Sequence, residues 1–162
     1  MKICVLGLDC AAPEVVFGDE RLVNLRRLMD AGVYGRLESV YPPITVPAWM
    51  CMCTSQDPGS LGVYGFRNRV DHSYEKLGFA NSASIKSLAI WDQLAREGKR
   101  SIIVGVPPNY PPRKINGISV ASNIHIARTV HRHVHREGTG RATILATTSP
   151  GLYVSTTVKC TA

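Results

Sequence analysis

Thr45 is the residue whose type and surroundings most clearly suggest chemistry, because prolines flank it in "YPPITVPAW". Pro47 has a fixed φ and favours a helix start, and its ring pushes Val46 towards an extended conformation. We therefore expect Thr45 at or just before a helix N-cap, beside backbone N–H groups that have no helical partner. There its hydroxyl either caps the helix or, once a base or metal removes its proton, attacks a phosphate bound by those N–H groups.

Asp9 is the second candidate, and it follows the apolar run "KICVLGL" of residues 2–8 directly. A continuous apolar run of this length is typical of a parallel strand buried on both faces. A carboxylate just beyond such a strand lies at the sheet edge where open α/β folds place their sites. It can hold a divalent cation there or cap the next turn, and the residues alone leave both roles open.

The elements that must position these two residues alternate along the chain. Apolar runs predict strands, amphipathic patterns predict helices, and a glycine-rich stretch predicts a loop. We expect strands at 2–8, 33–40 and 99–106, helices at 19–32, 47–55 and 84–98, and a loop at 56–69. Strands that alternate with helices indicate an α/β domain with a mainly parallel sheet.

The composition excludes several classes of protein. The chain has 162 residues, of which 44% are hydrophobic, as in an ordinary globular domain. No apolar run approaches the ~20 residues of a transmembrane helix, so we expect no membrane partner. The five cysteines are odd in number and never spaced C-x-x-C. We interpret most of them as buried apolar residues in a reducing compartment, and we expect a cytoplasmic protein. The side chains of Cys51 and Cys53 would diverge by about 200° on a helix, which argues against a metal pair there.

The formal net charge of +7 is unevenly distributed. Residues 1–121 have a net charge of +3, and residues 122–162 add +4 in a quarter of the chain. The second segment has four of the five histidines and no aspartate. Three of those histidines alternate along the chain: His131, His133 and His135. On a strand they would share one face, which a His₃ metal site requires. A basic arm that binds phosphate groups is another possible role of this segment. The alternatives are a genuine but divergent tail and translation in a shifted frame, which the composition favours.

Four sequence blocks resemble one known family. They are "VLGLDCAAPEVV", "LVNLRRLMDAGVYGRLESVYPPITVPAWMCMCTSQDPGSLGVYGF", "IWDQLAREGKRSIIVGVPPNYPP" and "INGISVAS". Together they are similar to the N-terminal part of the type I phosphodiesterase/nucleotide pyrophosphatase family, within the alkaline phosphatase superfamily. The resemblance covers nearly all of residues 2–121. It implies a doubly wound α/β sheet, incomplete at its C-terminal end, with residues 1–121 as the hydrolase domain and 122–162 as a basic tail.

The resemblance also implies site residues. Asp9 matches a metal ligand, and Thr45 matches a residue that is both nucleophile and metal ligand. The implied cofactors are two divalent ions, usually zinc, and the substrate is a phosphoester or nucleotide. The metal-activated threonine attacks phosphorus and forms a phospho-threonine that water hydrolyses. Asn68 is the nearest match to a phosphate-binding asparagine, although it is displaced by about two residues; otherwise it is a solvated loop residue.

The chain departs from the family pattern in three ways. Cys10 and Ser55 stand where the family commonly has glycine, and we expect both changes to affect packing rather than mechanism. The remaining metal ligands, an Asp-x-x-x-His, an Asp-His pair and a further histidine, lie far downstream in the family. Asp71 and His72 form an Asp-His pair too early in the chain, and we assign it to the surface. We therefore expect a truncated, weakly active or inactive hydrolase; the alternatives are a catalytically dead fragment and a small basic protein that binds phosphate or nucleic acid through its tail.

Overall fold

Helix α3 (Thr45–Thr54) carries much of the hydrophobic core. The structure is a computed structural model that describes residues 2–71, 73–121 and 134–136. Val46 and Met50 of α3 are 0% and 3% exposed. They belong to a cluster that also contains Cys51, Cys53, Leu61, Val63, Ala80, Ile85 and Ala89. The helix that begins at Thr45 is thus anchored by its own buried face, which fixes the position of its first turn.

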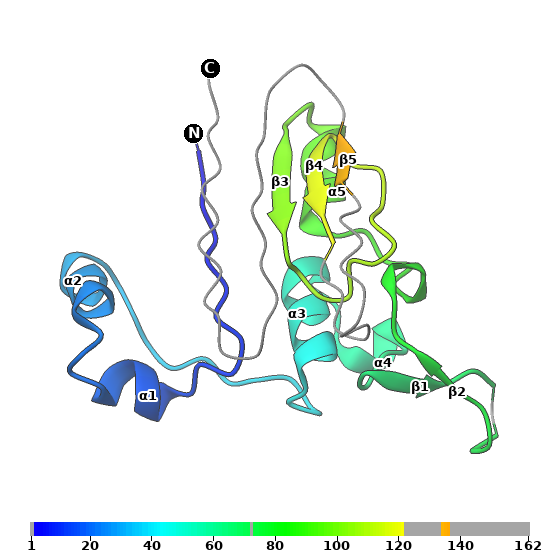
Figure 1. Cartoon of the computed structure of the whole chain (residues 1–162), viewed down its shortest axis with the longest axis horizontal. Coiled ribbons are helices and arrows are strands. Elements are labelled where there is room, and N and C mark those ends of the chain that lie inside the picture. Colours follow the sequence, from blue (N-terminus) through cyan, green and yellow to red (C-terminus); the bar gives the residue numbers. More distant parts are fainter. Residues whose placement is uncertain (1, 72, 122–133, 137–162) are drawn as a thin grey trace.

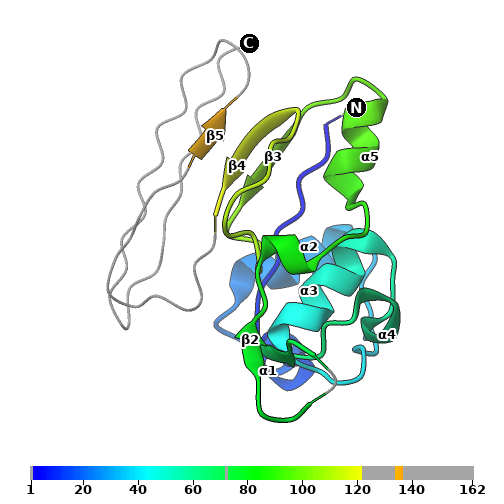
Figure 2. The same ribbon diagram turned by 90° about the vertical axis from the view of Figure 1, so that its right-hand side faces the viewer.

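A small mixed sheet lies beside α3 (Figure 1). Strands β3 (Ser101–Val104) and β4 (Gly117–Val120) pair in parallel, and β5 (Val134–Arg136) pairs antiparallel with β4. Helix α5 (Ile90–Arg96) contacts β3, and Figure 2 shows it beside the sheet. The expected strand at 99–106 and the α/β class are confirmed, but the sheets of the described residues are not mainly parallel.

The other elements are short. They comprise α1 (Pro13–Gly18), α2 (Val23–Ala31), α4 (Pro58–Leu61), the 3₁₀ helix η1 (Ser82–Ser84), and a hairpin of β1 (Arg67–Arg69) and β2 (Leu77–Phe79). Side chains cap two of the short helices: Asp57 accepts from the backbone N–H of Ser60, and Asn81 caps η1. These caps satisfy amides that a single helical turn leaves unpaired.

The strands expected at 2–8 and 33–40 are wrong. Both segments lie outside every strand that the structure describes, although residues 2–8 run in the same direction as β3 in Figure 1. Val5 is 77% exposed and Leu37 is 95% exposed, so neither segment is buried on two faces. An apolar run becomes a strand only where a neighbour pairs with its backbone, and the described residues give these two runs no such partner.

Several helix boundaries also differ from expectation. Helix α2 begins at Val23 rather than at residue 19, and α5 begins at Ile90 rather than at 84, because η1 occupies the start of that range. The expected loop at 56–69 contains α4 and reaches β1. Val46 is helical rather than extended, because the missing N–H of Pro47 costs nothing in a first turn and Val46 is fully buried there.

Most of the basic C-terminal segment lies outside the described residues. Its only described part is β5, where His135 pairs with Ser119 of β4, so His131 and His133 are not placed. The division into 1–121 and 122–162 stays a prediction. In the part of the chain that the structure describes, no helix is long and apolar enough to cross a membrane.

Candidate active site

Asp9 and Thr45 meet at the start of α3. The Thr45 hydroxyl donates to Asp9 Oδ2 over 3.4 Å, and this contact joins residues 36 positions apart. Asp9 is exposed and Thr45 is half-buried, so solvent or a ligand reaches the pair. The two residues that the sequence singled out therefore form one accessible pair of oxygen atoms.

The separation of these oxygens suits two ligands of one metal ion. It exceeds the usual O–H···O distance of about 2.7–2.8 Å, so the direct hydrogen bond is weak. Two ligands that each lie about 2.0–2.1 Å from a tetrahedral zinc ion stand about 3.3–3.4 Å apart. Carboxylate and hydroxyl oxygens are also suitable ligands for divalent cations. Asp9 and Thr45 thus fit as two members of a metal-ligand set.

The local backbone leaves the Thr45 hydroxyl free of a capping role. Ile44 is the N-cap residue, and no side chain caps α3; Thr45 is the first helical residue. The first helical hydrogen bond runs from the Ala48 N–H to the Ile44 carbonyl at 3.0 Å. The N–H groups of Thr45 and Val46 precede it and belong to the positive end of the helix dipole, which favours a phosphate or alkoxide beside the hydroxyl.

Cys10 and Ser55 both have left-handed backbone conformations. Their φ values are 56° and 57°, and they are the only non-glycine residues with positive φ in the described chain. Ser55 ends α3, where its N–H donates to the Cys51 carbonyl at 2.9 Å. Left-handed geometry costs a residue with a Cβ about 1–2 kcal/mol. Glycine, which the resemblance implies at both positions, would adopt this geometry without that cost, and the expectation that these changes affect packing rather than mechanism stays a prediction.

Asn68 lies in β1 with its carboxamide turned to the local backbone. Its Oδ1 accepts from the Tyr64 N–H at 2.8 Å, and its Nδ2 donates to the Gly65 carbonyl at 3.1 Å. A Cβ added to Gly65 would lie 3.8 Å from the Ile44 side chain, so this turn packs beside the N-cap of α3. Asn68 is thus a half-buried strand residue rather than a solvated loop residue, and its phosphate-binding role stays a prediction.

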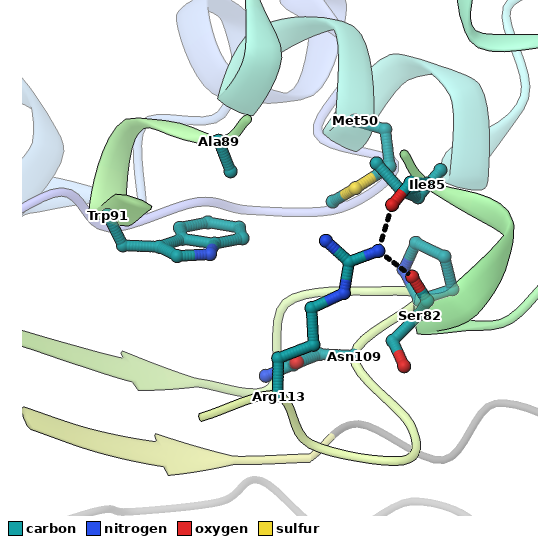
Figure 3. A pocket seen from close by; sticks show the side chains of 8 residues that line it. Met50, Ser82, Ile85, Ala89, Trp91, Asn109 and Arg113 are labelled. Atoms are coloured by element: carbon teal, nitrogen blue, oxygen red, sulfur yellow. Dashed lines mark hydrogen bonds between the residues drawn. The ribbon is translucent and has the colours of Figure 1, made fainter. Parts of the chain in front are cut away.

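A small cavity between α3, η1, α5 and the segment before β4 is too small for a substrate. Its volume of about 20 Å³ suits roughly one water molecule. Figure 3 shows Arg113 reaching into it, where the guanidinium donates to the carbonyls of Ser82 and Ile85. Arg113 therefore fixes the segment before β4 onto η1.

The cysteines of α3 are unsuited to metal binding. Cys51 and Cys53 are each 8% exposed. Burial raises the pKa of Cys53 to about 11 and also raises the pKa of Cys51, so both thiols stay protonated near neutral pH. Among the residues that the structure describes, no group of three or more His, Cys, Asp or Glu side chains could hold a metal ion. Asp71 accepts from the Ser73 N–H at 2.8 Å, and its neighbour His72 lies outside the described residues.

The family model for type I phosphodiesterase / nucleotide pyrophosphatase matches residues 3–154, which is most of the chain. The chain belongs to this family. Comparison with curated proteins and with solved structures gave no match.

Membership of the type I phosphodiesterase/nucleotide pyrophosphatase family indicates hydrolase chemistry on phosphoester or nucleotide substrates, and such enzymes generally depend on metal ions.

One contact beside the Asp9–Thr45 pair was not predicted from the sequence, and it joins Gly7 to Trp49. Gly7 lies two residues before Asp9, and Trp49 lies four residues after Thr45. Sequence spacing alone does not show that the two segments touch.

Proposed function

We propose that this chain is part of a metal-dependent phosphoester hydrolase in which Thr45 is the nucleophile and Asp9 helps to hold the metal. The observation that carries the proposal is the 3.4 Å approach of the Thr45 hydroxyl to Asp9 Oδ2 at the open end of α3. Family membership supports the reaction class. Phosphodiesters and nucleotide pyrophosphates are the proposed substrates, and an alkaline-phosphatase-like sheet is the proposed architecture of the whole domain.

Each residue has a distinct task in this proposal. Asp9 accepts the hydroxyl hydrogen bond and so orients Thr45 Oγ1. The first-turn N–H groups of α3 hold the phosphoryl oxygens, and Thr45 Oγ1 attacks phosphorus as the P–O bond to the leaving group breaks. The hydroxyl proton passes to solvent, and the leaving alkoxide takes up a proton from water and departs as the alcohol. Water then releases the phosphoryl group from the threonine. Two divalent ions, with zinc as the proposed metal, would supply Lewis-acid chemistry when bound, with Asp9 and Thr45 as two of the ligands. Asp9 and Thr45 by themselves make an incomplete ligand set for two ions.

Hydrolysis of an aryl phosphodiester tests the proposal. The full chain is assayed with Zn²⁺ or Mn²⁺ and compared with Thr45→Ala, and Thr54→Ala serves as a control at the far end of α3. We expect weak metal-dependent turnover that Thr45→Ala abolishes. Turnover that survives Thr45→Ala would exclude Thr45 as the nucleophile.

A catalytically dead fragment is the second candidate. It is favoured because no group of three or more His, Cys, Asp or Glu side chains among the described residues could hold a metal ion. In that case the chain would bind metal weakly and turn nothing over. A small basic binding protein is the third, and steep salt dependence that is lost on deleting residues 123–162 would identify it.

A cytoplasmic location also remains a proposal. It is supported by Cys4, Cys10, Cys51 and Cys53, all of which are free thiols in the described chain. Mass spectrometry with an alkylating reagent before and after reduction, on protein from its native cell, would test it. Disulfide-linked cysteines in that protein would argue for an oxidising compartment.

A further inference from the structure

Trp49 lies directly against the backbone of Gly7. A Cβ built on Gly7 would fall 2.6 Å from Trp49 Cζ3 and would overlap Cη2, so a larger residue at position 7 would have to displace the indole. Gly18 and Gly35 have nothing within 4 Å of the corresponding position. The indole is half-buried and packs on the hydrophobic core as well. Trp49 therefore links the core to the segment that carries Asp9.

The contact is in register with the pair at the active site. Thr45 and Trp49 are four residues apart on α3, so they share a face and are separated by about 6 Å along the axis. Gly7 and Asp9 are two residues apart, and both the Cβ direction of Gly7 and the Asp9 carboxylate face α3. The segment thus meets the helix at two points, Asp9 on Thr45 and Gly7 on Trp49.

We propose that Trp49 is a positioning residue that acts through Gly7, and that this contact holds the Asp9 carboxylate beside the Thr45 hydroxyl. Among the described residues no strand pairs with residues 2–8, and the contact between Gly7 and Trp49 packs this segment against α3. The consequence for catalysis rests on the function proposed above. The positional claim itself does not depend on metal or substrate.

A thiol cross-link between positions 9 and 45 measures that position directly. The full chain carries Asp9→Cys and Thr45→Cys, and serine replaces three native cysteines: Cys4, Cys10 and Cys160. A bifunctional thiol reagent that fluoresces only when both ends react then reports the proximity of the two positions. Gly7→Ala is compared with Gly35→Ala, which adds the same methyl group in open space. Overpacking of this kind typically shifts a local equilibrium about tenfold, so we expect Gly7→Ala to slow cross-linking by about that factor.

A second pair of variants separates positioning from general loss of structure. Trp49→Ala removes the indole and should slow cross-linking by itself. Gly7→Ala should then have no further effect in the Trp49→Ala background, because the overlap is gone. Trp49→Phe retains an aromatic ring and should recover part of the rate. If Gly7→Ala acts as Gly35→Ala does, or slows cross-linking equally with and without the indole, the proposal is wrong.

Metal binding by the native chain distinguishes this proposal from the proposed function. In a Trp91→Phe chain, Trp49 is the remaining tryptophan, and its emission reports Zn²⁺ beside it. Failure of Zn²⁺ to change that emission, with cross-linking that responds to Gly7→Ala, would count against the metal-dependent function alone. Cross-linking that ignores Gly7→Ala overturns the positioning role, whatever the metal does.

Discussion

The Thr45 hydroxyl and Asp9 Oδ2 lie 3.4 Å apart although 36 positions separate them along the chain. A partly buried helix supplies the threonine, and an exposed turn supplies the aspartate. Thr45 is therefore fixed by the core, whereas Asp9 is held by few contacts. This difference determines which substitutions should affect stability and which should affect the site.

Ser55→Gly should stabilise the chain. Its φ of 57° costs a residue with a Cβ about 1 kcal/mol, and glycine removes that cost at the end of α3. Urea unfolding measures the gain. Ser87→Gly is the matched control, because Ser87 lacks positive φ and should lose a little stability from added backbone freedom. Equal effects at the two positions would contradict a left-handed Ser55.

Asn68→Ala should destabilise the turn beside Ile44. It leaves the Tyr64 N–H and the Gly65 carbonyl without their side-chain partner, at a cost of about 1–3 kcal/mol. Asn68→Asp retains the acceptor for Tyr64 but loses the donor to Gly65, so its melting temperature should fall between the other two. If all three chains melt together, the carboxamide does not hold the turn.

The Asn109–Ser119 hydrogen bond should couple the loop after β3 to β4. Asn109 Nδ2 donates to Ser119 Oγ at 2.8 Å, and the residues are 8% and 1% exposed. Each single alanine substitution should cost about 1–3 kcal/mol, because it leaves a buried polar partner unsatisfied. A double-mutant cycle should show a coupling energy of at least about 0.5 kcal/mol. Additive effects would mean that water replaces the lost partner.

Stability should fall in alkaline solution because of Cys53. Burial raises the pKa of its thiol from 9.0 to about 11. The folded chain therefore keeps a proton that the unfolded chain releases, so this contribution is complete below pH 9 and is lost as pH rises towards 11. Urea unfolding midpoints across this window should fall more steeply for the native chain than for Cys53→Ala. Parallel curves would place the thiol in contact with water.

Local signals in the sequence predicted some elements well. The prolines around Thr45 predicted α3, and the apolar run at 99–106 predicted β3. The apolar runs at 2–8 and 33–40 wrongly predicted strands, because an apolar run does not reveal whether a neighbouring strand is present to pair with it.

The candidate site was predicted in part. Resemblance to the family pointed to Asp9 and Thr45, which the structure brings together. It also marked Cys10 and Ser55 as departures from glycine, yet only the backbone shows that both require left-handed geometry. The contact of Trp49 with Gly7 was beyond prediction, because no pattern states which helix face meets an extended segment.

Manganese binding is the most direct test of whether Asp9 and Thr45 are ligands of one metal site. Mn²⁺ favours oxygen ligands over the histidines of the basic tail, and its electron paramagnetic resonance signal reports the free ion. We expect weak Mn²⁺ binding by the native chain, and we expect both Asp9→Asn and Thr45→Val to abolish it. Asp57→Asn changes an exposed carboxylate but keeps a good N-cap, and it should bind as the native chain does. Mn²⁺ binding that survives both Asp9→Asn and Thr45→Val would show that Asp9 and Thr45 are not ligands of one metal site.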